Sequence, residues 1–227
     1  MVLVGLRSQS ICFFGARTPL LDDYIETCQR LELAVSHLIC VDTGKPRLFH
    51  RQTIVDLHNA GTAEKQSPFV AAAFSPQRRE ELATLAIQHK FIPAAALVDP
   101  TSLVANSTVV GVGTYINAMT VVASVSRVGE HVFINRGCNI GHHNLIGDFV
   151  SFGPGVTAAS NIRIGERAVV GAGAVLLPGV TIGSGAVVSA GTRIHQDIPP
   201  DHLAIGEKPT IKPIKKNSKL VYYPDQE

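Results

Sequence analysis

Two adjacent histidines, His142 and His143, stand in residues 134–153, a stretch with almost no other titratable side chains. An imidazole exchanges a proton near neutral pH, so it can act as the base that removes a proton from a hydroxyl or an amine. Taken alone, the pair is equally well explained as two solvated surface histidines. The choice between these interpretations depends on the elements that hold the pair, which follow from the rhythm of the surrounding sequence.

From residue 98 onward, the sequence repeats an apolar residue every six positions without an insertion. The seventeen positions of this series are Val98, Val104, Val110, Ile116, Val122, Val128, Ile134, Ile140, Ile146, Phe152, Ala158, Ile164, Val170, Leu176, Ile182, Val188 and Ile194. A glycine follows many of them, and a small or β-branched residue stands four positions after most of them. An α-helix would drift out of phase with this pattern within two repeats.

A six-residue period resembles that of the left-handed parallel β-helix, in which three hexads form one triangular coil of about 18 residues. The repeated aliphatic side chain then points inward and stacks on its copy in the next coil, about 4.8 Å away. The series predicts roughly five such coils. Ser124 and Ser160 stand 18 residues before and 18 residues after His142, so they should lie one coil before and one coil after it, on a rung that solvent can reach.

Residues 1–96 lack this period and alternate between short apolar runs and amphipathic segments. We expect strands at residues 11–15, 36–42, 68–74 and 91–98, and helices at residues 19–33, 52–61 and 75–90. Pro19 and Ser75 stand where a first helical residue and an N-cap are favoured. The alternation predicts a small Rossmann-like α/β domain, followed by the left-handed parallel β-helix over residues 97–199 and an extended arm over residues 200–227.

Composition excludes several classes of function. The formal net charge is +2, and no basic run interleaved with aromatic residues precedes the C-terminal arm, so we expect no nucleic-acid partner. Residues 168–192 carry no charge, but their glycines, Pro178 and the six-residue beat argue against a membrane span. The N-terminus has no signal-peptide pattern and the four cysteines form no C-x-x-C pair, which predicts a cytoplasmic protein with reduced thiols.

Residues 139–149, NIGHHNLIGDF, resemble a motif of the sugar acyltransferases of bacterial surface-glycan and lipopolysaccharide biosynthesis. These include the bacillosamine and perosamine N-acetyltransferases and the sialic acid O-acetyltransferases. Ile140, His142, Ile146, Asp148 and Phe149 occupy positions of the motif. The resemblance covers nearly the whole chain. It implies a homotrimer that binds acetyl-CoA between adjacent β-helices and acetylates an amino or hydroxyl group of a nucleotide-linked sugar.

Carried over residue by residue, the resemblance makes His142 the general base and His143 and Asn135 its supporting residues. It implies acetyl-CoA-binding positions at Ser151, Ser160, Ala172 and Ala190, and substrate-binding positions at Gly15, Arg17 and Asp42. The chain departs from the family in three places. His143 stands where the family has an acidic residue, Ser151 where it often has a second histidine, and residues 14–19 (FGARTP) where it has a glycine-rich turn.

Several other residues can be explained by a structural role instead of, or as well as, a role in ligand binding. Asn117 and Asn135 lie 18 residues apart, as stacked side chains of a structural hydrogen-bond ladder would. His131 and His195 are expected at exposed turns, and Cys138 in the core. The basic side chains of the C-terminal arm either meet the phosphates of coenzyme A or are simply solvated; they are Lys208, Lys212, Lys215 and Lys216.

The spacing of the histidines argues against a metal site. The γ-class carbonic anhydrases are also β-helical, but they carry a His-x-x-x-x-His pair, whereas the residues five positions after His142 and His143 are Gly147 and Asp148. We therefore expect no metal cofactor. The residues still allow a non-catalytic β-helix scaffold, or an acyltransferase for a non-sugar acceptor such as an amino acid. The α/β domain argues against a non-sugar acceptor, because serine-type acetyltransferases typically have a helical N-terminal domain.

Overall fold

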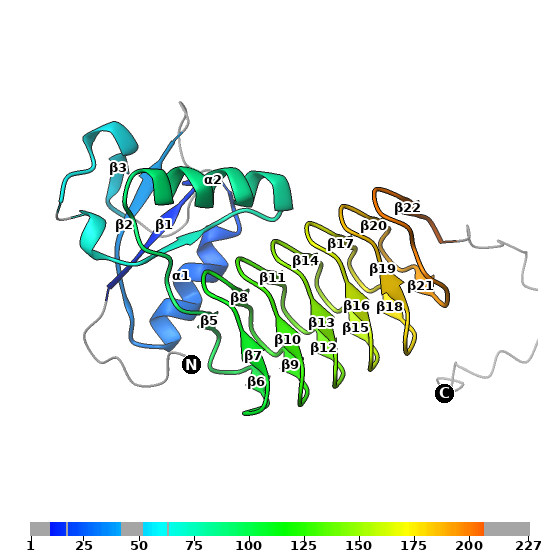
Figure 1. Cartoon of the computed structure of the whole chain (residues 1–227). Coiled ribbons are helices and arrows are strands. Elements are labelled where there is room, and N and C mark those ends of the chain that lie inside the picture. The colour runs from blue at the N-terminus through cyan, green and yellow to red at the C-terminus, as the bar shows by residue number, and fades with distance from the viewer. Residues whose placement is uncertain (1–9, 17, 42–51, 63, 207–227) are drawn as a thin grey trace, which may run out of the picture.

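The computed structural model describes residues 10–16, 18–41, 52–62 and 64–206. Figure 1 shows a small unit of helices and strands at one end of a straight stack of coils. Arg17, Asp42 and the four lysines of the C-terminal arm lie outside the described residues.

The N-terminal unit is built on a parallel sheet of four strands in the order β3-β2-β1-β4. Its strands are β1 (Ser10–Phe14), β2 (Ala34–Cys40), β3 (Ile54–Asp56) and β4 (Phe69–Ala71). Its helices are α1 (Leu21–Arg30), α2 (Pro76–Gln88) and the short 3-10 helices η1 (Leu57–Asn59) and η2 (Glu64–Gln66). Ser75 caps α2 as expected, because its Oγ accepts a hydrogen bond from the Arg78 amide at 3.4 Å.

The helix expected at residues 52–61 is wrong. This segment forms β3, which pairs with β2, and then the single turn of η1. The β-branched Ile54 and Val55 favour a strand. The Asp56 side chain then accepts a hydrogen bond from the His58 amide at 2.9 Å, which begins a tight turn instead of a helix.

From residue 97 onward, the chain winds through strands of two residues each. They are β5 (Leu97–Val98), β6 (Leu103–Val104), β7 (Val109–Val110), β8 (Tyr115–Ile116), β9 (Val121–Val122), β10 (Arg127–Val128), β11 (Phe133–Ile134), β12 (Asn139–Ile140), β13 (Leu145–Ile146), β14 (Ser151–Phe152), β15 (Thr157–Ala158), β16 (Arg163–Ile164), β17 (Val169–Val170), β18 (Val175–Leu176), β19 (Thr181–Ile182), β20 (Val187–Val188), β21 (Arg193–Ile194) and β22 (Leu203–Ala204).

These strands form three parallel sheets. The first sheet is β5-β8-β11-β14-β17-β20-β22, the second is β6-β9-β12-β15-β18-β21, and the third is β7-β10-β13-β16-β19. From β5 to β18, each strand pairs with the strand 18 residues further on, and β20 pairs with β22 sixteen residues further on. The predicted period and pairing are confirmed, and they fit a left-handed parallel β-helix. None of the described helices is long and apolar enough to cross a membrane, and residues 168–192 lie in the coils of β17 to β20.

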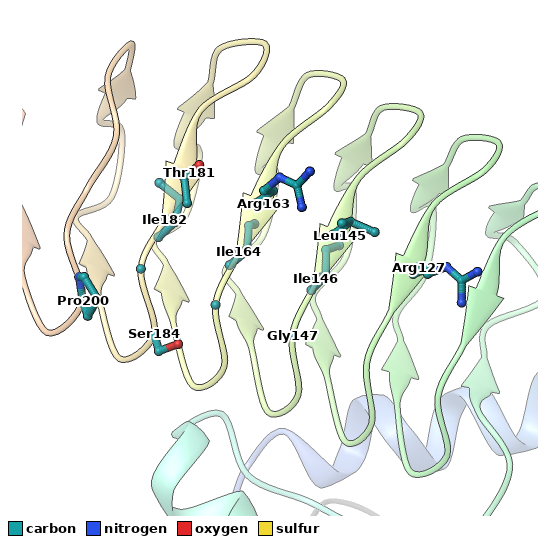
Figure 2. Close-up of a pocket in the computed structure, with 12 residues that line it drawn as sticks. Arg127, Leu145, Ile146, Gly147, Arg163, Ile164, Thr181, Ile182, Ser184 and Pro200 are labelled. Atoms are coloured by element: carbon teal, nitrogen blue, oxygen red, sulfur yellow. The ribbon is translucent and has the colours of Figure 1, made fainter.

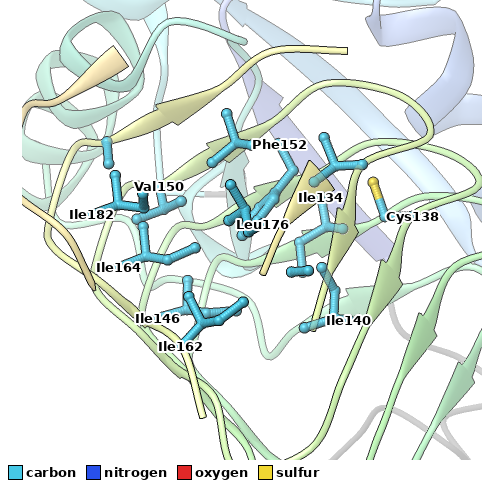
Figure 3. Close-up of a cluster of buried hydrophobic side chains, with 14 of the residues drawn as sticks. Ile134, Cys138, Ile140, Ile146, Val150, Phe152, Ile162, Ile164, Leu176 and Ile182 are labelled. Carbon is cyan, nitrogen blue, oxygen red and sulfur yellow. The ribbon is translucent and has the colours of Figure 1, made fainter. Parts of the chain in front are cut away.

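The interior of the coils is filled by the predicted hexad residues. Each of the seventeen is the second residue of one of the strands β5 to β21, and all from Ile116 onward are buried (Figure 3). The small residues that stand four positions after the hexad residues form a second repeat series, and their hydroxyl and thiol groups donate hydrogen bonds to backbone carbonyls 15 residues later. These pairs are Ser102 to Asn117, Thr108 to Ala123, Thr114 to Gly129, Thr120 to Asn135, Ser126 to Gly141 and Cys138 to Gly153. The predicted core position of Cys138 is confirmed.

The corners of the coils repeat a left-handed backbone conformation at six-residue spacing. His143 has a φ of 58°, and Val125 and Asn161, its counterparts in the adjacent coils, have 59° and 61°. The glycines that follow the inward aliphatic residues are needed for a different reason, which is the close approach of the next coil. A Cβ on Gly147 would stand 2.7 Å from the amide nitrogen of Glu166 in the next coil, so the coils pack too closely for a side chain there.

The α/β unit covers the first sheet of the first coils (Figure 1). Leu97, Tyr115 and Phe133 lie on three successive strands of this sheet and are buried in the contact. Tyr24 of α1 stacks on Tyr115 with 3.9 Å between the ring centroids. These residues hold the unit against the end of the β-helix.

A buried arginine fastens the same contact. Arg79 of α2 is 1% exposed, and none of its hydrogen-bond acceptors among the described residues is a carboxylate. At 2.6–3.0 Å its guanidinium donates to the carbonyls of Ala73, Phe74, His131, Phe149 and Val150 and to the Oγ of Ser151. Burial lowers its pKa to about 10, so the group remains charged at neutral pH. The acceptors belong to both parts of the chain, and one side chain therefore joins α2 to two coils.

His131 is buried, and the expected exposed turn is wrong. Its ring stacks on Phe149 at 5.2 Å and on Phe69 at 6.0 Å, and its Nδ1 has no hydrogen-bond partner among the described residues. Burial and, to a lesser degree, the positive charge of Arg79 lower the pKa of His131 to about 4. The ring is therefore neutral in the folded protein at physiological pH. His195 is exposed, as expected.

This buried imidazole should make stability fall in mild acid. The pKa of a histidine in the unfolded chain is about 6.5, whereas burial lowers the pKa of folded His131 to about 4. Between these two pH values the unfolded state binds more protons than the folded state, so acidification favours unfolding. We expect His131 to account for a loss of about 2 kcal/mol between pH 7 and pH 5. Urea unfolding of the unmodified protein and of His131→Phe, at pH 7 and at pH 5, measures this loss of stability. An equal pH dependence in the two proteins would contradict this assignment.

Candidate active site

His142 and His143 lie at the corner between the second and third sheets, after β12 and before β13. Both side chains are exposed. Their Nδ1 atoms are 2.9 Å apart, and the planes of the two rings are nearly perpendicular, at 86°. The two imidazoles are therefore in direct contact, which the sequence did not reveal.

This contact constrains the protons on both rings. Between two neutral imidazoles, one Nδ1 carries the hydrogen and the other accepts it. When His142 is the donor, its Nε2 keeps a free lone pair and can accept a proton. When His143 is the donor, Nε2 of His142 already carries a hydrogen. His142 can thus act as a base in one of the two arrangements, with His143 holding its ring.

Hydrogen bonds to the coils on either side fix the backbone of this corner. The His143 amide donates to the Ser124 carbonyl, and the Asn161 amide donates to the His142 carbonyl, both at 3.1 Å. Ser124 and Ser160 are the neighbours of His142 in register, as the 18-residue spacing predicted. Ser160 is partly exposed. Of the acetyl-CoA-binding candidates, it is the one that lies beside His142 in the same chain.

Asn144 is a supporting residue that sequence reasoning missed. Its side chain is 1% exposed, and its Nδ2 donates to the carbonyls of Gly141 at 3.0 Å and Ala159 at 2.8 Å. Its Oδ1 accepts from the Ile162 amide at 2.8 Å. Asn144 therefore braces the turn that carries the histidine pair. The sequence did contain a sign of this role. Asn144 puts a side-chain amide at an inward position that elsewhere in the repeat holds a hydroxyl, thiol or apolar side chain.

Three other predicted residues lie away from His142 in the same chain. Asn135, Ala172 and Ala190 follow strands of the first sheet, at the corner between the first and second sheets, so the width of the second sheet separates them from His142. Ala172 and Ala190 are exposed. Asn135 is 5% exposed, and its Oδ1 accepts from Asn117 Nδ2 at 3.2 Å and from the Arg136 amide at 2.8 Å. These bonds are those of the structural ladder.

Ser151 does not face a ligand cleft in this structure, which corrects its placement among the acetyl-CoA-binding residues. It lies on β14 under the α/β unit and has no exposed surface. Its Oγ donates to the Phe74 carbonyl at 2.6 Å and accepts from Arg79 at 3.0 Å. Its hydroxyl proton is therefore engaged in the contact between the two parts of the chain.

Gly15 is explained by packing. It follows β1 with a φ of 102°, and a Cβ there would stand 2.9 Å from both the Ala72 carbonyl oxygen and a methyl carbon of Leu82. The turn leads into α1, whose first turn carries Asp22 and Asp23. Two carboxylates at a helix N-terminus disfavour a phosphate there. Arg17 and Asp42, the other two substrate-binding candidates, lie outside the described residues.

A groove of about 520 Å³ runs over the third sheet, next to the histidine corner (Figure 2). Its walls include Arg127, Leu145, Arg163 and Thr181, the first residues of four successive strands of this sheet. Leu145 is two residues after His143, so the groove begins beside the pair. Within the part of the chain that the structure describes, no three His, Cys, Asp or Glu residues are grouped so that they could hold a metal ion.

Comparison with known proteins supports the repeat and the fold. Residues 161–196 match the family "Bacterial transferase hexapeptide (six repeats)". No curated protein matches the sequence.

A mutant of perosamine N-acetyltransferase from Caulobacter crescentus, solved with CoA and GDP-perosamine, is similar with a TM-score of 0.80 and 25% identity, over 89% of this chain and 96% of that one. Two structures of lower identity share the fold. The acetyltransferase domain of PglB from Neisseria gonorrhoeae, in complex with acetyl coenzyme A, has a TM-score of 0.77 and 23% identity, over 91% of this chain and 100% of that one. WeeI from Acinetobacter baumannii has a TM-score of 0.78 and 20% identity, over 88% of this chain and 97% of that one. The resemblance to the sugar acyltransferases is confirmed.

Proposed function

We propose that this acyltransferase of the hexapeptide-repeat type transfers an acetyl group from acetyl-CoA to an amino or hydroxyl group of a nucleotide-linked sugar, with His142 as the general base. The observation that carries the proposal is the exposed His142–His143 contact at 2.9 Å, set in a fold shared with enzymes of this chemistry. Acetyl-CoA is proposed as a co-substrate, because the similar structures were solved with CoA or acetyl coenzyme A. We place the reaction in the cytoplasm, where surface-glycan precursors are assembled.

The proposed reaction needs one proton acceptor and no acyl-enzyme. Nε2 of His142 takes the proton of the acceptor while the acceptor's nitrogen or oxygen bonds to the thioester carbon. The tetrahedral intermediate then collapses, the carbon–sulfur bond breaks, and the thiolate of coenzyme A leaves and takes the proton. His143 holds the ring of His142 throughout. Cys138 is not a candidate nucleophile, because it is buried and its thiol is bonded to the Gly153 carbonyl.

Release of the coenzyme A thiol tests this function. The protein is incubated with acetyl-CoA and a panel of nucleotide-linked sugars carrying a free amine or hydroxyl, and thiol is measured against time. We expect acceptor-dependent release with one member of the panel, and mass spectrometry of that product distinguishes N- from O-acetylation. No thiol release with any sugar of the panel, together with no binding of acetyl-CoA, would favour a non-catalytic scaffold.

A homotrimer is proposed as the working form of the enzyme. Within one chain, His142 and the candidates Ala172 and Ala190 stand at different corners of the coil. One site can use both corners only if two chains contribute one each, and threefold symmetry repeats that contact without an open end. Light scattering coupled to size exclusion should give three times the 24.2 kDa chain mass. A monomer at micromolar concentration would rule out a shared site.

Acetyl-CoA should stabilise the folded protein. A ligand that binds only the native state adds about 2.7 kcal/mol at a hundredfold excess over its dissociation constant. Thermal unfolding should therefore shift upward with acetyl-CoA concentration, and EDTA should change neither the melting temperature nor the activity. Activity that is lost in EDTA and restored by a divalent metal would contradict the proposed chemistry.

A further inference from the structure

The groove beside the histidine corner carries two arginines on one face of the third sheet. Arg127 lies on β10 and Arg163 on β16, with Leu145 of β13 between them (Figure 2). Because adjacent strands are about 4.8 Å apart, the two arginines are about 10 Å apart at their backbones. A small group above Leu145 is within reach of both side chains.

Neither guanidinium group has a partner among the residues that the structure describes. Arg127 and Arg163 are exposed, and neither makes an ion pair or a side-chain hydrogen bond with any residue that the structure describes. This contrasts with Arg136 and Arg167, which pair with Asp23 and Glu80 across the contact with the α/β unit. Two unpaired cations beside one groove favour an anionic ligand.

The acidic residues of this region lie at the opposite edge of the groove. Asp148 and Glu166 follow Gly147 and Gly165, which line that edge, and Glu130 stands one coil earlier at the same corner between the third and first sheets. Asp148 Oδ1 accepts from the Glu130 amide at 2.7 Å, and Glu166 pairs with Arg167 at 3.6 Å. These carboxylates repel an anion from that edge. The part of the groove that favours an anion is therefore the part nearer the histidines.

The position of the arginines relates them to the reaction. Arg127, Leu145 and Arg163 each stand two residues after a corner residue, and the corner residue before Leu145 is His143. The arginines therefore flank the histidine pair, one coil before it and one coil after it. A molecule whose reacting group is at His142 lies across one or both of them.

We propose that Arg127 and Arg163 form a phosphate-binding subsite for the ligand that reacts at His142. The inference rests on the proposed function and deepens it. Guanidinium groups bind phosphate oxygens through paired charge-assisted hydrogen bonds, and both proposed substrates carry phosphate: the coenzyme on its adenosine end, the nucleotide sugar in its diphosphate. The shared chemistry is a phosphate ester in the groove, and the experiment distinguishes its source.

The experiment uses Arg127→Gln and Arg163→Gln, which remove the charge at an exposed position. Arg193→Gln is the matched control, because Arg193 is also exposed, also begins a strand, and lies on β21 of the second sheet, away from the groove. Steady-state kinetics are measured with acetyl-CoA and with acetyl-pantetheine, which lacks the phosphates, and then with the nucleotide-linked sugar and the free sugar. Light scattering reports the oligomeric state of each variant.

We expect each groove variant to raise KM about tenfold for one phosphate-bearing substrate and to leave kcat nearly unchanged. The increase should vanish with the analogue that lacks phosphate, and Arg193→Gln should behave as the unmodified protein. An effect confined to acetyl-CoA identifies the coenzyme as the source, and one confined to the nucleotide sugar identifies the acceptor.

Unchanged KM values in an active protein would overturn the subsite and leave the proposed function intact. A change of oligomeric state without a phosphate-dependent change in KM would also overturn it, and would assign the arginines to a contact between chains. If the unmodified protein neither binds acetyl-CoA nor acetylates any sugar, the proposed function itself fails.

Discussion

Replacing His142 with alanine is expected to lower turnover by about 10²–10⁴-fold, the usual contribution of a positioned general base. Affinity for coenzyme A should change little, because the lost group acts on the acceptor's proton and not on the bound coenzyme. Single-turnover acetyl transfer measures the first effect and titration calorimetry the second. The exposed position of His142 makes a general loss of folding from this substitution unexpected.

The neighbouring histidine provides the controls. His143→Ala should cost much less, because a neutral imidazole orients His142 but stabilises the imidazolium that forms there far less than a carboxylate would. His143→Glu supplies a carboxylate at the same place and should retain or raise the activity. If both alanine variants were equally inactive, the 2.9 Å pair would be acting as one unit. If only His143→Ala were inactive, the base would be His143.

The substitution Arg79→Met should lower the free energy of unfolding by about 4 kcal/mol. It removes the guanidinium donor from five backbone carbonyls and the Ser151 hydroxyl in a buried contact. The Phe74 and Val150 carbonyls keep a second donor, so the carbonyls of Ala73, His131 and Phe149 carry most of the loss. Each unsatisfied buried acceptor costs about 1–3 kcal/mol, and water entering the gap recovers only part of that. Urea unfolding at pH 7 measures the free-energy difference.

Arg78→Met is the matched control for this experiment. Arg78 precedes Arg79 on the same helix, but its side chain is 38% exposed and forms a surface ion pair with Glu81 at 3.0 Å. Surface pairs of this kind contribute about 1 kcal/mol or less. Similar losses in the two variants would show that Arg79 does not fasten the α/β unit to the coils.

The β-helix could be predicted in detail because its contacts repeat. From β5 to β18 each strand pairs with the strand 18 residues further on, so every inward position obeys the same steric rule. All seventeen hexad residues are the second residue of a strand, and the fourteen from Ile116 onward are buried. The place of His142 beside Ser124 and Ser160 followed from that rule alone. In the α/β unit no such repetition exists, and the short segment at residues 52–61 was decided by pairing between β3 and β2 that no local pattern encodes.

The residues at the contact between the two parts escaped prediction for the same reason. His131 and Ser151 occupy corner and strand positions that elsewhere in the coils face solvent, and they are buried here only because α2 and β4 lie over them. Arg79 did leave a signal, since it shares a helical face with the apolar Leu82, Ala83 and Ala86. The His142–His143 contact depends on side-chain torsions at one corner, which spacing does not determine.

The unbroken six-residue beat also sets how such a chain can change in length. Because every coil contacts mainly the coils before and after it, the stack behaves as a one-dimensional array. Duplication of one whole 18-residue coil would preserve every register. A single inserted residue would put the later aliphatic side chains out of phase unless it formed a bulge at a corner. The histidine corner and the contact with the α/β unit, including the ion pair between Arg167 and Glu80, both lie before Val170, so coils can be gained or lost beyond that point without touching either. The unit by which this domain can change its length is therefore the coil.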